Sequence, residues 1–192
     1  MKRLLIANRA EIACRVIRTA HEMGIETVAV YSDVDASALH VQQASTSYAL
    51  GGNTPAESYL HIEKIIQAAL ATRSDAIHPG YGFLSENPDF AQAVIDAGLI
   101  WVGPSPASIR LLGNKAAAKR LAQQAGVPCL PGYDGLDEYG LVSEYSQSNA
   151  VMQEHADKIG YPLMVKAMNG GGGRGMRKVD KSADLLSALE SA

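Results

Sequence analysis

The most informative stretch of this chain is Tyr161-Pro-Leu-Met-Val-Lys-Ala-Met-Asn-Gly-Gly-Gly-Gly-Arg-Gly-Met176. Lys166 ends an apolar, strand-like segment, four consecutive glycines follow, and an arginine and a fifth glycine close the loop. Glycine has no Cβ, so the backbone N–H groups of such a loop can approach a phosphate closely. The lysine supplies a positive charge nearby. The stretch therefore predicts a loop that holds nucleotide phosphates, and ATP is the first ligand to consider.

Two other phosphate loops and one structural alternative compete with this interpretation. Gly170, Gly172 and Gly175 satisfy G-x-G-x-x-G, but that fingerprint lies between a strand and a helix. Here residues 176–179 alternate like a second strand, which indicates a hairpin lid. The Walker pattern, with Lys-Ser/Thr after the last glycine, is absent. A disordered glycine-rich linker is disfavoured because apolar strands flank the loop on both sides.

Composition narrows the class of protein. The 192 residues can hold one full domain and part of another. A net charge of −3 with scattered Lys and Arg argues against a nucleic-acid surface. Neither a membrane-length apolar run nor a secretory signal is evident, so we expect a cytoplasmic protein. Cys14 and Cys129 lack metal-site spacing and are expected to be free.

Strands alternate with helices over the first hundred residues. We predict strands at 3–8, 27–31, 76–78 and 99–102, and helices at 11–23, 58–71 and 88–97. This alternation predicts an α/β fold with a Rossmann-like parallel sheet covered by helices on both faces. The strand ends at Asn8, His78 and Gly103 should then line one crevice, where open α/β sheets bind ligands.

From Pro106 onward the pattern changes. Short helices are expected at 106–112, 115–125 and 152–159, followed by the hairpin and by a helix at 181–192 that Ser182 caps. We therefore expect one domain at 1–113, a helical linker at 114–130 and an incomplete lid domain at 131–192.

Two loops carry candidate site residues. In His78-Pro-Gly-Tyr-Gly-Phe-Leu-Ser-Glu-Asn87, proline and glycines force an irregular loop at a strand end. His78 taken alone is more often a packed residue than a functional one, whereas Tyr81-Gly82 can form a flat wall for a ring. Ser85 is a candidate cap for the next helix. In the other loop, Asn8 can bind a ligand or brace the turn, and Glu11 suits the helix start.

Lys115 is the second candidate cation. It lies in the first turn of a helix, where a cation is disfavoured unless it has an anionic partner. An ordinary solvated lysine is the alternative. Lys115 and Lys166 can share one triphosphate, and each charge-assisted contact is worth about 1.5–3 kcal/mol.

Together these motifs resemble the N-terminal part of biotin carboxylase, over essentially the whole chain. The segments that carry the resemblance are 7–13, 28–33, 58–60, 78–87, 102–104 and 161–176. The glycine loop is shared among ATP-grasp ligases, whereas the 78–87 motif is typical of biotin carboxylase. The resemblance implies a pre-ATP-grasp domain followed by the start of an ATP-grasp lid.

The resemblance also implies an activity and a set of roles. In the family, ATP and bicarbonate give carboxyphosphate, which carboxylates biotin on a carrier domain that serves a carboxyltransferase. It implies dimerisation through the N-terminal domain. The residues it assigns are Lys115, Lys166, Gly172, Gly173 and Met176 for ATP; Gly170, Gly171, Arg174 and Gly175 for the lid loop; His78, Tyr81, Gly82 and Glu86 for the biotin and bicarbonate side; and Arg18 and Glu22 for the dimer face.

Some positions depart from the family pattern. Ala10 replaces a usual glycine, Met168-Asn169 replace smaller residues, and residues 133–149 resemble a surface insertion. The family's magnesium-binding glutamates and catalytic arginine would fall beyond Ala192, so no catalytic or metal-binding residue is assigned here. We expect a truncated, inactive piece of a carboxylase, with a lean toward the methylcrotonyl-CoA type. Another ATP-grasp ligase and a free-standing, non-catalytic interaction domain are the alternatives.

Overall fold

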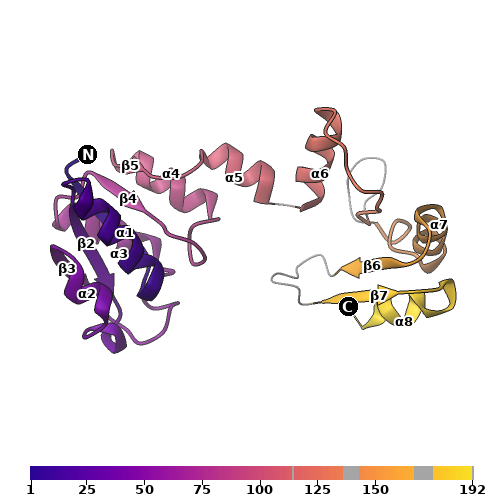
Figure 1. Cartoon of the computed structure of the whole chain (residues 1–192), viewed down its shortest axis with the longest axis horizontal. Coiled ribbons are helices and arrows are strands. Elements are labelled where there is room, and N and C mark those ends of the chain that lie inside the picture. Colours follow the sequence, from indigo (N-terminus) through magenta and orange to yellow (C-terminus); the bar gives the residue numbers. More distant parts are fainter. Residues whose placement is uncertain (114, 136–142, 167–174, 192) are drawn as a thin grey trace. The chain divides into compact units, whose positions relative to one another are not determined.

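The computed structural model describes residues 1–113, 115–135, 143–166 and 175–191 (Figure 1). The predictions for 167–174 and for the cap at Asn114 lie outside the described residues. Two compact units divide the chain, Met1–Ala118 and Lys119–Ala192, and each is described by itself. The domain boundaries expected from the sequence stay a prediction.

The first unit is built on a five-stranded sheet in which every pair is parallel, as predicted. The strand order is β3-β2-β1-β4-β5. The bounds are β1 Arg3–Ile6, β2 Glu26–Tyr31, β3 Thr46–Ala49, β4 Ala76–His78 and β5 Ile100–Trp101.

Helices cover both faces of this sheet, because successive side chains of a strand point to opposite sides. Leu4 and Ile6 of β1 pack with α1, whereas Leu5 packs on the other face with α3 and α4. Both clusters are apolar and buried, so the sheet is the middle of three layers, with a core on each face. The helices of the unit are α1 Ala10–Glu22, η1 Asp33–Asp35, α2 Leu39–Gln43, α3 Ile62–Ala71, α4 Pro88–Asp96 and α5 Pro106–Gly113, and α6 Lys115–Gln124 spans the division between units.

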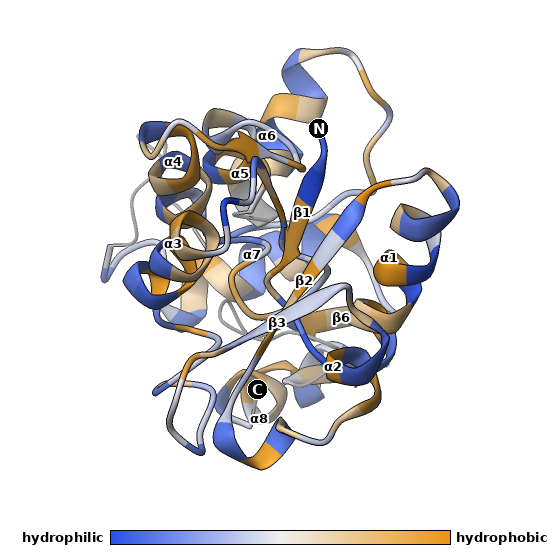
Figure 2. Ribbon diagram, turned by 90° about the vertical axis from the view of Figure 1, so that its left-hand side faces the viewer, coloured by the Kyte–Doolittle hydropathy of each residue, from blue (hydrophilic) through white to orange (hydrophobic). Residues whose placement is uncertain are grey.

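Three elements of this unit, η1, α2 and β3, were not predicted, and one helix is shorter than expected. The edge strand β3 is mostly exposed and pale in hydropathy, so it carries no apolar signal (Figure 2). The short helix α2 was also missed. The helix expected at 58–71 begins only at Ile62. Ser58 instead donates a hydrogen bond to the Thr54 carbonyl (2.6 Å), which closes a turn.

The cap of α4 is Asn87, and the prediction of Ser85 was wrong. The Asn87 carboxamide oxygen accepts from the backbone N–H groups of Asp89 (2.9 Å) and Phe90 (3.0 Å). Pro88 occupies the first helical position, where its missing N–H costs nothing. Ser85 lies one turn earlier, where its own N–H donates to the Gly82 carbonyl.

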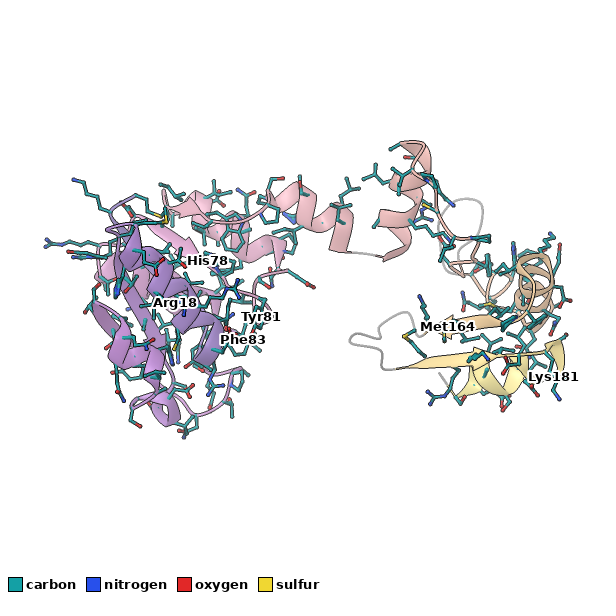
Figure 3. All side chains as sticks on the ribbon, viewed as in Figure 1. Arg18, His78, Tyr81, Phe83, Met164 and Lys181 are labelled. Atoms are coloured by element: carbon teal, nitrogen blue, oxygen red, sulfur yellow. The ribbon has the colours of Figure 1, made fainter. Side chains whose placement is uncertain are left out.

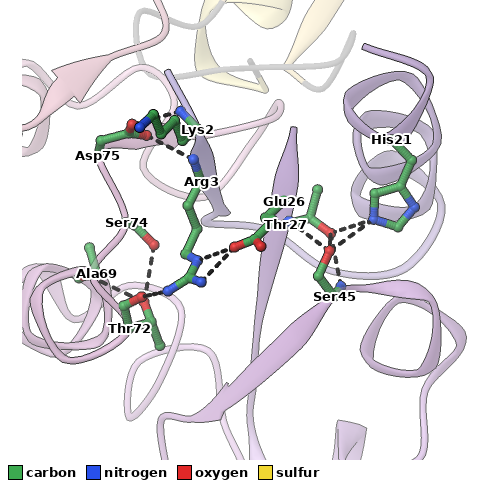
Figure 4. Close-up of polar contacts among 10 residues, drawn as sticks. All are labelled: Lys2, Arg3, His21, Glu26, Thr27, Ser45, Ala69, Thr72, Ser74 and Asp75. Atoms are coloured by element: carbon green, nitrogen blue, oxygen red, sulfur yellow. Dashed lines mark hydrogen bonds and ion pairs between the residues drawn. The ribbon is translucent and has the colours of Figure 1, made fainter. Parts of the chain in front are cut away.

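Polar contacts tie the amino ends of the strands together (Figure 4). The Arg3 guanidinium donates to Glu26 Oε2 from Nε (2.8 Å) and to the Thr72 carbonyl from Nη1 (2.6 Å). The Asp75 carboxylate accepts from the backbone N–H groups of Lys2 and Arg3. This edge of the sheet is therefore closed by its own side chains.

The second unit contains the antiparallel hairpin that the sequence predicted, β6 Leu163–Lys166 paired with β7 Met176–Val179. Its helices are α7 Asn149–Ile159, η2 Ser182–Asp184 and α8 Leu185–Glu190. Val179, Ala156, Leu185 and Ala188 form its buried cluster. The predicted cap at Ser182 was wrong, because α8 starts later and the Ser182 hydroxyl accepts from Gln153 Nε2 (2.7 Å).

Cys14 and Cys129 are both free, as expected. Within the described parts of the chain, every helix falls short of the length and apolar character needed to cross a membrane.

Candidate functional site

The loops that follow the strands of the first unit meet at the carboxyl edge of its sheet. Asn8, directly after β1, is buried, with 4% of its surface exposed. Its Nδ2 donates to the carbonyls of Pro79 and Tyr81, each at 2.8 Å, and its Oδ1 accepts from Arg9 N. Asn8 therefore braces the loop after β4, which is the second of the two roles considered for it.

Glycine is required where the two turns touch. Gly80 has φ +66°, and a Cβ built on it would lie 2.7 Å from Asn8 Nδ2. Gly82 has φ +64°, and nothing lies within 4 Å of its virtual Cβ. Phe83 keeps a left-handed φ of +42° despite its side chain. The sequence prediction of an irregular loop is thus confirmed.

His78 faces its own loop. The Gly80 N–H donates to His78 Nδ1 at 2.9 Å, so this nitrogen is an acceptor. Burial lowers the pKa of His78, because a low-dielectric surrounding disfavours the imidazolium. The ring is therefore neutral at pH 7 and stabilises the turn.

Tyr81 is the exposed ring of this loop, with 61% of its surface accessible. Its hydroxyl donates to Glu11 Oε2 at 2.9 Å, and this bond to a carboxylate raises the pKa of Tyr81. Figure 3 shows Tyr81 and Phe83 together on the loop that follows His78. Glu86 is also exposed. The ring of Tyr81 and the open space at Gly82 form a surface that suits a flat ligand.

A polar network under this edge, with Ser32, Asp35 and Tyr59 buried and Arg9 partly exposed, was not predicted. Asp35 accepts from Arg9 Nε (2.7 Å) and Nη2 (2.6 Å), from the Tyr59 hydroxyl (2.6 Å) and from Ser32 Oγ (3.1 Å). These residues come from three different loops. They lie up to 50 positions apart, and the sequence gives no local pattern that links them.

The network fixes the charge of its members. The Arg9 guanidinium holds the pKa of Asp35 well below its usual range, and the Tyr59 hydroxyl adds to this effect. Burial, with the bond to Asp35, raises the pKa of Tyr59 to about 12. At neutral pH the group is therefore a carboxylate held by a guanidinium and a phenol.

In the second unit, the hairpin presents a face of two cations and two thioethers. Lys166 pairs directly with Met176, and Met164 pairs with Lys178. Directly paired residues share one face of a sheet, and all four are exposed. Lys178 Nζ bonds Asp180 Oδ1 at 2.6 Å. A lysine for phosphate beside methionines for a flat apolar ring fits a nucleotide.

The other residues predicted for ATP binding and for the lid loop are only partly described. Gly175 follows the loop with a φ of +68°. Lys115 begins α6, but its side chain lies outside the described part. Gly170, Gly171, Gly172, Gly173 and Arg174 lie outside the described residues. Their phosphate contacts stay predictions.

Arg18 and Glu22 are exposed neighbours on the outer side of α1. They line a hollow of about 910 Å³ together with Leu39 and Gln43 of α2. The proposed dimer residues are thus accessible on one helix. Over the described ranges, no group of three or more His, Cys, Asp or Glu side chains comes close enough to hold a metal ion.

Two family models match the chain. Residues 1–109 match the biotin carboxylase N-terminal domain, which is more than half of the chain. Residues 114–192 match the ATP-binding domain of the carbamoyl-phosphate synthase L chain.

Curated relatives match over almost all of this chain. The mitochondrial methylcrotonoyl-CoA carboxylase subunit alpha of Mus musculus is 49% identical over 190 residues, 99% of this chain and 25% of that protein. The biotin carboxylase of Nostoc sp. is 51% identical over 193 residues, 99% of this chain and 40% of that protein. The chain thus spans a quarter to two fifths of the length of these relatives.

Solved structures agree with these relatives. A biotin carboxylase of Campylobacter jejuni in complex with β,γ-ATP has a TM-score of 0.87 and 43% identity, over 99% of this chain and 41% of that one. The biotin carboxylase domain dimer of Hydrogenobacter thermophilus 2-oxoglutarate carboxylase, with MgADP and bicarbonate, has a TM-score of 0.85 and 41% identity, over 100% and 41%.

Proposed function

This chain belongs to the biotin carboxylase N-terminal domain family, and we propose from that membership that it forms the biotin-facing and first nucleotide-binding parts of a biotin carboxylase. The parent reaction uses ATP and bicarbonate to carboxylate biotin on a carrier domain, within an acyl-CoA carboxylase. The observation that carries the proposal is the match to biotin carboxylases across 99% of the chain at about half identity.

The hairpin face and the carboxyl edge of the sheet bind different ligands. The exposed Lys166 of the hairpin holds nucleotide phosphate, and Met176 opposite it packs against the adenosine. Lys115 and the glycine loop complete the phosphate contacts. At the sheet edge, Tyr81, Gly82 and Glu86 border biotin and bicarbonate. The neutral His78 holds the turn that presents them. When bound, MgATP would supply the activation of bicarbonate.

The first test is the intact mass of the native polypeptide and its retention on streptavidin. A heavier polypeptide, or one captured through biotin, together with ADP release that requires both bicarbonate and biotin, is the expected result. A mass equal to 192 residues, with no biotin and no bicarbonate-dependent ADP release in any complex, contradicts the proposal. That outcome favours a non-catalytic interaction domain.

The nucleotide role is tested with Lys166→Ala in the same carboxylase. Losing one charge-assisted phosphate contact raises the KM for ATP about 10- to 150-fold, which corresponds to roughly 1.5–3 kcal/mol. Lys158→Ala is the matched control, because that exposed lysine pairs with Glu154 on α7. An unchanged KM for ATP in Lys166→Ala removes Lys166 from the site.

The partners follow from the same family. A carrier domain and a carboxyltransferase act with this chain, and Arg18 and Glu22 lie in a homodimer interface. Reversing one charge, Arg18→Glu, is expected to weaken the dimer in light scattering, because it leaves two carboxylates in the interface. Among acyl-CoA acceptors, methylcrotonyl-CoA remains the preferred one.

A cytoplasmic location stays a prediction that cell fractionation tests. The mouse relative is named as mitochondrial.

A further inference from the structure

Tyr59 occupies a central place at the carboxyl edge of the sheet, although the resemblance that includes residues 58–60 assigned it no role. Only 2% of its surface is exposed. Its hydroxyl donates to Asp35 Oδ2 at 2.6 Å and accepts from Ser32 N at 3.1 Å. Its ring stacks on Phe83, with centroids 5.1 Å apart and 2° between the planes. One side chain thus joins the loops after β2 and β3 to the loop after β4.

The orientation of Tyr59 is set from behind. Asp35, which accepts its hydroxyl, is itself held by two bonds from Arg9 and one from Ser32. A carboxylate held by a planar guanidinium fork has little freedom to turn. The contacts with Asp35 therefore hold the Tyr59 ring in place independently of its stack on Phe83.

The backbone conformation of Phe83 requires a side chain that holds it in place. It has a left-handed φ of +42°, a conformation that bulky residues rarely adopt and that persists only where the surroundings hold it. Its ring lies against Tyr59. Asn8 binds the carbonyls of Pro79 and Tyr81. The loop is thus held at Pro79 and Tyr81 by an amide and at Phe83 by an aromatic stack.

We propose that Tyr59 is a positioning residue for the loop 79–86: through its stack on Phe83 it fixes the conformation that presents Tyr81, Gly82 and Glu86 to the ring of biotin. The idea that this loop faces biotin rests on the proposed function, whereas the coupling of Tyr59 to the loop stands on the contacts alone. Tyr59 itself touches no substrate.

The coupling is measured by amide hydrogen exchange on this chain. The informative amides are Gly80, bonded to His78 Nδ1, Ser85, bonded to the Gly82 carbonyl, and Asn87, bonded to the Leu84 carbonyl. Tyr59→Leu removes the stack, so these amides should exchange about tenfold faster or more. Tyr59→Phe keeps the ring but loses the bonds to Asp35 and Ser32, so the exchange should return part of the way to the slow rate.

A matched control separates positioning from general destabilisation. Ile17→Ala truncates a buried residue that packs on the other face of the sheet. The variants are compared at equal free energy of unfolding, adjusted with urea. Faster exchange of the three loop amides in Tyr59→Leu than in Ile17→Ala supports the proposal. Equal exchange in the two variants, or no recovery in Tyr59→Phe, overturns it.

A second variant covers the case in which Tyr59→Leu does not fold. Phe83→Leu removes the other half of the stack from a partly buried position. The same three amides should exchange faster in Phe83→Leu than in the Ile17→Ala control. If they do not, the stack does not hold the loop and the proposal is wrong.

The consequence for function is a selective effect on biotin. In the native carboxylase, Tyr59→Leu should raise the KM for free biotin about tenfold with the KM for ATP unchanged, and Tyr59→Phe, which keeps the stack, should restore it in part. Equal changes in both KM values overturn the positioning role. If the unmodified enzyme shows no bicarbonate-dependent ADP release, the proposed function fails, while the exchange result still decides the coupling.

Discussion

The carboxyl edge of the sheet and the exposed face of the hairpin present their side chains in opposite ways. At the sheet edge, Asn8, Asp35 and Tyr59 are buried and bonded to one another's loops. On the hairpin, Lys166 and Met176 extend into solvent from paired strand positions. The first surface is fixed before any ligand arrives, whereas the second can adapt to one. A substitution should therefore change stability at the edge and binding on the hairpin.

The largest expected difference in unfolding free energy concerns a buried side chain that supports the sheet. Phe90 lies in the first turn of α4, fully buried, with its ring edge-on to Trp101 at 5.4 Å. Phe90→Ala should cost about 3–5 kcal/mol, because it leaves a cavity in the core. The measurement is urea unfolding followed by Trp101 fluorescence. Met164→Ala on the hairpin face, 45% exposed, is the control and should stay within about 0.5 kcal/mol.

A smaller difference is expected between two ion pairs. Asp35→Asn should cost about 1–3 kcal/mol, because Asp35 is buried and its bonds to Arg9 are charge-assisted. Asp180→Asn, which loses an exposed pair with Lys178, should cost about 0–1 kcal/mol. Equal losses in thermal unfolding would remove the contrast between the two surfaces.

The stability contributed by the Arg9–Asp35 pair depends on pH. The native pKa of Asp35 is depressed, so its contribution is present above the unfolded pKa of about 3.9 and is lost as the pH falls below that value. Stability measured from pH 5 to pH 2 should fall less steeply in Asp35→Asn than in the wild type. Parallel curves would contradict the assignment.

A second pH effect is expected from His40, which is fully buried in α2. Its Nε2 bonds the Val30 carbonyl at 3.3 Å, and its Nδ1 has no hydrogen-bond partner within the part of the chain that the structure describes. Burial lowers the pKa of His40, so the folded protein binds fewer protons than the unfolded chain. Stability should fall as the pH drops below about 6.5.

The measurement for His40 is the unfolding free energy between pH 7.5 and pH 5. His40→Leu should flatten the curve over this range, because it removes the titrating group. His61→Leu serves as the control, since His61 is exposed and pairs with Glu63 on the surface. A curve unchanged by His40→Leu would show that another group titrates.

The smallest expected effect tests the turn beside Asn8. Ala10 has φ +55°, a left-handed conformation that disfavours a residue with a Cβ by roughly 1–2 kcal/mol. Ala10→Gly removes this cost but loses chain entropy, so it should stabilise the protein by about 0.5 kcal/mol. Ala93→Gly, inside α4, should destabilise it by about 0.5–1 kcal/mol. Changes of the same sign in thermal unfolding would refute the argument.

What the sequence predicted follows from where the signals lie. The strands of the parallel sheet are short apolar runs bounded by turn residues, so β1, β2 and β4 were found. The hairpin was found because residues 176–179 alternate after the glycine loop. The edge strand β3 was missed, since its residues Thr46 and Ser47 are polar and exposed. Hydrophobic periodicity arises from burial, and an exposed edge strand buries too few side chains to show it.

The candidate site divides in the same manner. The loop after His78 was recognised from its glycines and polar residues, which are local signals. The partners Asp35 and Tyr59 were missed because their roles depend on contacts 24 and 26 positions away in sequence. The helix predicted at 58–71 included Tyr59, because Ile62, Ile65, Ile66 and Ala69 fit a helical period that was extended back to Ser58, whereas the chain forms a turn there. Long-range polar pairing leaves no periodic trace.

The close approach of Gly80 to Asn8 has a consequence for protein engineering and for sequence divergence. A Cβ at position 80 would fall 2.7 Å from the Asn8 amide nitrogen, so any larger residue at 80 demands a smaller one at 8. A smaller residue at 8 would release the carbonyls of Pro79 and Tyr81. Substitutions at these two positions, 72 apart in sequence, are therefore expected to depend on each other. Mutant libraries that vary them separately would sample mostly non-functional pairs.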